Sequence, residues 1–157
     1  MKSRFITLLF FMSISVILIE SCKKKEDEGN ENETKISSFG DTESHNMGQN
    51  CMSCHKSGGT GEGWFNVAGT VYDSLKTNTY PNTIIKLYSE PNGAGMLKHT
   101  IQVDGKGNFY TTANIDFGSG LYPAVVSNSG VKYMSSATTT GTCVSCHGVS
   151  TDKIWAK

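Results

Sequence analysis

Few large aliphatic side chains are available to this chain for building a hydrophobic core. From residue 22 onward, Leu, Ile, Val and Phe make up 22 of 136 residues, about 16%, which is below the level at which a chain usually builds a core unaided. The charges nearly cancel and Trp and Tyr are well represented, so intrinsic disorder is not expected outside the ends. We therefore expect something other than side chains to supply apolar volume.

Residues 1–21 have the form of an export signal. Lys2 and Arg4 precede an apolar run over 5–19, which is too short for a comfortable membrane span. The run ends in a small residue followed by Cys22. This arrangement resembles the lipobox of bacterial lipoproteins, which implies that Cys22 is diacylated and becomes the mature N-terminus. The alternative is a plain secretory signal followed by an incidental cysteine.

Residues 22–38 are predicted to form a flexible polar tether, because this stretch is charged and contains no aromatic residue. The mixed charges over 23–28 resemble the export tags of some Gram-negative lipoproteins. The resemblance implies an exported protein, lipid-anchored to the outer membrane at its periplasmic or cell-surface face. The near balance of charges over the chain excludes a strongly basic nucleic-acid binder.

The other four cysteines form two copies of the pattern Cys-x-x-Cys-His, which is the attachment pattern for c-type haem. Two thiols a short loop apart add to the two vinyl groups of one porphyrin, and the next residue places an imidazole on the iron. The chain is thus similar to c-type cytochromes, and we expect two covalently attached haem c groups. The predicted cofactor-binding residues are Cys51, Cys54, His55, Cys143, Cys146 and His147. Each porphyrin would supply the apolar volume that the side chains lack.

Three other interpretations of the cysteine pairs fit the sequence less well. A four-thiolate zinc site uses similar pairs, but 88 residues separate them here, far beyond the usual spacing of about 15 to 20 residues. Local disulfides suit an exported protein but do not require a histidine after each pair. A thioredoxin-like redox motif lacks its βαβ context.

Each iron also needs an occupant for its sixth coordination position. His45 lies six residues before the first motif and predicts bis-His coordination there, with Met47 as a competitor and a surface histidine as the plainer interpretation. For the second haem, Met134 lies nine residues before the motif and is favoured over His99, which falls in a predicted strand. Ordinary packing beside the porphyrin is the plainer interpretation of Met134.

The segment 64–133 carries short runs of β-branched and aromatic residues bounded by turns. This pattern predicts a mainly β fold in which the strands form a small antiparallel β-sandwich. The expected strands are 64–72, 83–89, 97–103, 108–113, 121–127 and 131–134. Two loop-rich haem-binding segments, 39–63 and 134–157, flank this sandwich.

Three stretches, 67–72, 83–88 and 104–110, resemble successive strands of carboxypeptidase-regulatory-like, transthyretin-like sandwiches. In that family the last stretch makes a glycine-containing turn into a core aromatic residue. The resemblance implies a spacer or docking module, with one haem loop at each chain end of the domain.

The sequence thus predicts a membrane-anchored dihaem c-type cytochrome that transfers electrons in the periplasm or at the outer cell surface, and not an enzyme. Expected partners are redox proteins, the membrane through the lipid anchor, and further copies of this chain. The alternatives are a haem enzyme, such as a peroxidase or small-oxyanion reductase, and a structural subunit of a cytochrome assembly.

Overall fold

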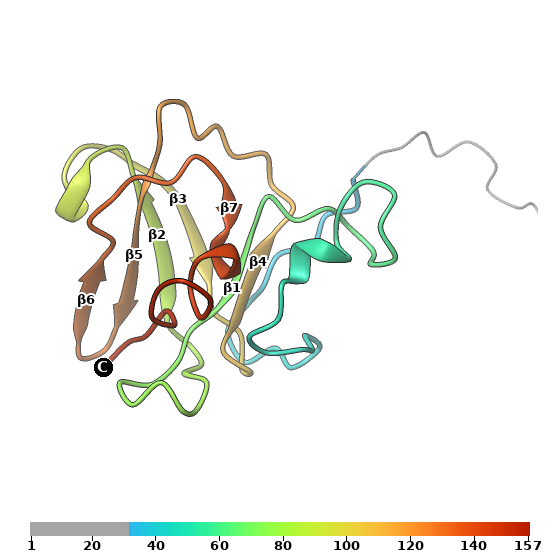
Figure 1. Cartoon of the computed structure of the whole chain (residues 1–157), viewed down its shortest axis with the longest axis horizontal. Helices are drawn as coiled ribbons and strands as arrows, with labels where there is room; N and C mark the ends of the chain where they lie inside the picture. The colour runs from blue at the N-terminus through green and yellow to red at the C-terminus, as the bar shows by residue number, and fades with distance from the viewer. Residues whose placement is uncertain (1–31) are drawn as a thin grey trace, which may run out of the picture. The chain divides into compact units, whose positions relative to one another are not determined.

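Seven strands and three short 3-10 turns make up the described part of the chain, residues 32–157, in this computed structural model (Figure 1). The strands are β1 (Val67–Thr70), β2 (Ile84–Tyr88), β3 (Leu97–Gln102), β4 (Asn108–Thr111), β5 (Tyr122–Ser127), β6 (Gly130–Tyr133) and β7 (Gly141–Thr142). The turns are η1 (Cys51–Ser53), η2 (Pro91–Gly93) and η3 (Cys143–Ser145). The predicted signal segment, Cys22 and the first part of the tether lie outside the described residues.

The strands form two sheets, and the predicted mainly β fold is confirmed. A four-stranded sheet has the order β3-β2-β5-β6 and is antiparallel throughout. A three-stranded sheet has the order β4-β1-β7, in which β1 pairs antiparallel with β4 and parallel with β7. All six expected strands are present: β1 to β5 are shorter than expected, and β6 is shifted by one residue toward the N-terminus. Strand β7 was not expected.

The hydrophobic core draws on the inner faces of both sheets. Alternation along β2 buries Ile85 and Leu87, as expected for a strand with one face toward the core. From the other sheet, Val67 on β1 and Phe109 on β4 are each at most 2% exposed. The core is small, in keeping with the short supply of aliphatic residues.

A tight turn before β4 organises the neighbouring loop. Asp104 is fully buried, and its Oδ1 accepts hydrogen bonds from the backbone N–H groups of Lys106 at 2.8 Å and Asn108 at 2.9 Å. Gly107 in this turn has φ +86°, a conformation that glycine adopts without steric cost. The turn leads into the core residue Phe109, which is the arrangement expected from the sequence.

Both ends of the described chain pair with the sandwich. Ile36 forms a bridge with Thr111, and Ser37 is buried. The last residues of the predicted tether therefore belong to the fold. At the other end, Trp155 forms a bridge with Tyr72.

Candidate functional site

The two Cys-x-x-Cys-His loops fold alike. In the first, η1 is closed by a hydrogen bond from the backbone N–H of His55 to the carbonyl of Cys51, with N and O 2.9 Å apart. In the second, η3 is closed by the same bond from His147 to Cys143, at 3.0 Å. Each turn therefore holds two cysteines and a histidine within one short loop, and all four of these thiols are free.

Each histidine ring is oriented by a bond to the backbone. Nδ1 of His55 lies 2.8 Å from the carbonyl oxygen of Glu62, and Nδ1 of His147 lies 2.7 Å from that of Asp152. A carbonyl only accepts, so these contacts assign the proton to Nδ1 in both rings. In the neutral ring, Nε2 then carries the lone pair that can ligate a metal.

Packing also fixes the His55 ring. It stacks on Phe65 with centroids 4.2 Å apart and planes inclined by 10°. Gly61 lies against the same ring, since a Cβ added there would be 2.7 Å from Nδ1 of His55. Neither Phe65 nor Gly61 was singled out from the sequence, because their role depends on how the loop folds back.

His45 lies beside His55, as the predicted bis-His pair requires. Their ring centroids are 6.0 Å apart and their planes are inclined by 38°. Two metal–imidazole bonds of about 2.0 Å, plus the distance from each nitrogen to its ring centre, give about 6 Å. The spacing therefore fits one iron between the rings. Met47, the competitor, is 47% exposed.

The segment carrying His45 is held against the sandwich by hydrogen bonds. Nζ of Lys106 donates to the carbonyl of Ser44 at 2.7 Å, and Nδ2 of Asn108 donates to the Ser44 hydroxyl at 2.9 Å. The backbone N–H of Gly48 donates to Oγ1 of Thr70 at 2.9 Å. The turn before β4, together with the facing ends of β4 and β1, thus positions this candidate ligand.

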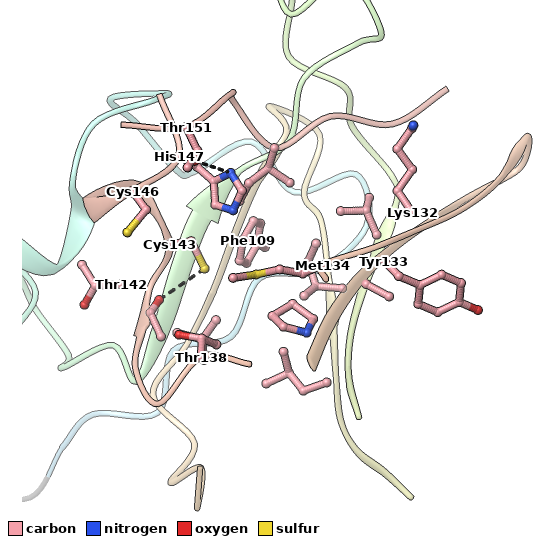
Figure 2. A pocket seen from close by; sticks show the side chains of 18 of the residues that line it. Phe109, Lys132, Tyr133, Met134, Thr138, Thr142, Cys143, Cys146, His147 and Thr151 are labelled. Carbon is pink, nitrogen blue, oxygen red and sulfur yellow. Dashed lines mark hydrogen bonds between the residues drawn. The ribbon is translucent and has the colours of Figure 1, made fainter. Parts of the chain in front are cut away.

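The second loop borders a cavity of about 670 Å³ that extends between the inner faces of the two sheets (Figure 2). A volume of this size falls in the range of cofactor and ligand pockets. Most of its lining is apolar, and the second loop supplies both thiols and the imidazole. Lining residues that the argument uses are Leu87, Phe109, Met134, Cys143, His147 and Trp155.

Met134 and His99 lie at opposite edges of the four-stranded sheet. Met134 extends the pairing of β6, since its backbone N–H donates to the carbonyl of Pro123 at 2.9 Å, and its side chain projects into the cavity (Figure 2). His99 lies on β3, where it pairs with Leu87 of β2, and β3 is three strand spacings of about 4.8 Å away from β6. The cavity is lined by Met134 and His147 but not by His99.

Two of the thiols are shifted toward their neutral form. Burial raises the pKa of the Cys143 thiol to about 12, and burial also raises the pKa of the Cys51 thiol. Metals bind the thiolate rather than the thiol, so a metal ion ligated by these two sulfurs would have to displace their protons. Within residues 32–157, no three His, Cys, Asp or Glu side chains are grouped to hold a metal ion.

The two loops touch each other, although the strands β1 to β7 separate them in the sequence. The Thr142 hydroxyl donates to Sδ of Met52 at 3.3 Å, and both η1 and η3 contact β1. The parallel pairing of β7 with β1 returns the second loop to the strand beside the first. No strand was expected after residue 134, so this contact between the loops was not predicted from the sequence.

Comparison with known proteins identifies no relative: no family model, curated protein or solved structure matches this chain. In the part of the chain that the structure describes, no helix is long and apolar enough to cross a membrane.

Proposed function

We propose that this protein is a membrane-anchored dihaem c-type cytochrome that transfers electrons in the periplasm or at the outer cell surface. One observation carries the proposal: both attachment loops fold alike, and each directs the Nδ1 proton of its histidine to a backbone carbonyl. This leaves a metal-ligating Nε2 beside two thiols in both loops. A haem bound in this way supplies a one-electron iron couple.

Residues of the chain would hold the first haem at the surface. Cys51 and Cys54 would form the thioether bonds, with His55 on one face of the iron and His45 on the other. His45 and Cys54 are exposed, so this haem would lie open to a redox partner. A ligand on both faces leaves no open coordination position, which favours electron transfer over haem enzymology.

The second haem would occupy the cavity between the sheets. Cys143 and Cys146 would attach it, His147 would be its proximal ligand and Met134 its distal ligand. A His and Met pair raises the reduction potential relative to bis-His coordination. The exclusion of water from the cavity, compared with the surface site, changes the reduction potential further. We therefore propose that the two haems differ in potential, and that the second is reduced first.

Contact between the two loops supports rapid exchange of electrons between the haems. The hydrogen bond from Thr142 to Met52 joins the loops directly, so the two porphyrins would be attached to neighbouring points of one sandwich. Lipidation of Cys22 would keep this unit at the outer membrane. Redox proteins would then be its partners.

The experiment is co-expression with a c-type haem maturation system, followed by intact mass and reduced-minus-oxidised spectra. We expect a mature protein with two covalent haems and an acylated N-terminal cysteine. The paired variants Cys51→Ser with Cys54→Ser, and Cys143→Ser with Cys146→Ser, should each lose one haem. Ser53→Ala lies inside the first motif and should keep both. A mature protein without covalent haem would refute the proposal, and a high-spin spectrum that responds to cyanide would favour the haem-enzyme alternative.

A further inference from the structure

A lysine faces the cavity from a strand position that alternation reserves for an apolar residue. On β6, Lys132 pairs with Val125, which is 8% exposed, and so shares the inner face of the sheet with it. The neighbours Val131 and Tyr133 point the other way and are exposed. Lys132 itself is half-buried and lines the cavity next to Met134.

The ammonium group of Lys132 has unused hydrogen-bonding capacity. Its Nζ lies 3.3 Å from the ring centroid of Trp155, a cation–π contact that fixes its position. A lysine ammonium has three N–H donors, and no ion pair within residues 32–157 includes Lys132. The other lysine that lines the cavity, Lys153, donates from its Nζ to the carbonyl of Lys76 at 3.1 Å. No such hydrogen bond is formed by Nζ of Lys132 within the described residues, so its donors are available to an anion.

Lys132 also lies opposite the two thiols of the second loop. Figure 2 shows Lys132 on the far side of the cavity from Cys143 and Cys146. A planar group bonded to both thiols along one edge would present its opposite edge toward Lys132. In a haem, the edge opposite the thioether bonds carries the two propionate carboxylates.

We propose that Lys132 binds a carboxylate of the planar group held in this cavity, namely a propionate of the second haem. The inference rests on the proposed function. The Trp155 ring holds the ammonium at the cavity wall, and the carboxylate completes its hydrogen bonds in a charge-assisted pair. Neutralising the propionate removes negative charge near the iron, so Lys132 favours the reduced haem.

A competing explanation is that Lys132 protects the edge of the sheet. Strand β6 is an edge strand, and inward-pointing charges there discourage pairing with other chains. That role needs a charge of either sign. Carboxylate binding needs a positive charge, so substitutions that change only the sign separate the two roles.

The test is a redox titration of the dihaem protein carrying Lys132→Gln, Lys132→Glu or Lys132→Arg, with Lys98→Gln as the control. Lys98 is exposed on β3, the opposite edge strand. At fixed ambient potential, we expect Lys132→Gln to lower the reduced-to-oxidised ratio of one haem about tenfold, or about 59 mV for a one-electron couple. Lys132→Glu should lower it further, whereas Lys132→Arg and Lys98→Gln should match the wild type.

Equal potentials in wild type, Lys132→Gln and Lys132→Glu, with both haems attached, would overturn the inference and leave the proposed function intact. Absence of covalent haem from the wild type would instead overturn the proposed function. If Lys132→Gln accumulates without its second haem, Lys132→Arg decides. Arginine keeps the positive charge. Carboxylate binding would therefore be refuted if Lys132→Arg also loses the haem, or if the reduction potential of its second haem shifts as far as that of Lys132→Glu.

Discussion

Replacing Gly141 by alanine should separate β7 from β1. Gly141 pairs with Val67 in the parallel register, and a Cβ added to it would overlap the carbonyl oxygen of Asn66 and lie 2.6 Å from Cα of Val67. These are backbone atoms, so no side-chain rotation relieves the contact. Overpacking of this kind costs about 1–3 kcal/mol, and each strand hydrogen bond lost adds about 1 kcal/mol. We expect a loss of about 2–4 kcal/mol, a large part of the roughly 5–15 kcal/mol that stabilises a domain.

Urea unfolding followed by far-ultraviolet circular dichroism measures this loss. With a slope of about 1–3 kcal/mol per molar urea, the midpoint should fall by about 1–3 M. Gly58→Ala is the control, because its Cβ would meet nothing within 4 Å and only its φ of +69° is unfavourable. A Gly141→Ala midpoint at or above that of Gly58→Ala would refute the reasoning that β7 requires a residue without Cβ.

Three further predictions concern the ligands and the buried thiol. His45→Ala should convert one haem of two to a high-spin spectrum, whereas His99→Ala should change neither; an unchanged spectrum in His45→Ala would reject bis-His coordination. Met134→Ala should abolish the near-infrared methionine band and lower the potential of the second haem, and no change at either haem would reject Met134 as a ligand. In the apoprotein, burial raises the pKa of the Cys143 thiol from 9.0 to about 12. The thiol therefore ionises first in the unfolded chain as the pH rises. The buried neutral thiol of Cys143 contributes fully to the free energy of unfolding below about pH 9. This contribution is lost between pH 9 and 12, by at most about 1.4 kcal/mol per pH unit. Denaturant unfolding of Cys143→Ala should show a shallower decline over this range, and an equal decline would contradict the role of burial.

Local patterning was sufficient to predict most of the strands. In β2, a run of β-branched and aromatic residues lies between two turns, which predicts the position of this strand. Its buried face, with Ile85 and Leu87, is known only from the structure, because Lys86 is the one polar residue in the strand. In contrast, β7 is two residues long and contains Gly141 and Thr142. No alternation is visible in so short a segment. Its pairing depends on β1, which is distant in the sequence, and on the room left by a missing Cβ.

The candidate site divides in the same way. The spacing of each Cys-x-x-Cys-His motif identifies the thiols and the histidine, because their chemistry is local. The approach of His45 to His55 and the projection of Met134 into a cavity depend on tertiary structure, so the sequence offered them only as candidates. The sequence does not single out Lys132, because lysine is common in edge strands. Only the strand register shows that this residue faces inward.

The parallel pairing of β7 with β1 also sets the order in which the strands pair during folding. One edge of β1 is filled by β4 as soon as residue 111 is available, while the other edge waits for residues 141–142. Pairings between residues far apart in the sequence form slowly, because a long loop must close first. Cys143 and Cys146 follow β7 directly, so the loop that carries them reaches its place on the sandwich last. A chain that emerges N-terminus first therefore presents the first attachment loop early and keeps the second open to chemistry until the sandwich closes.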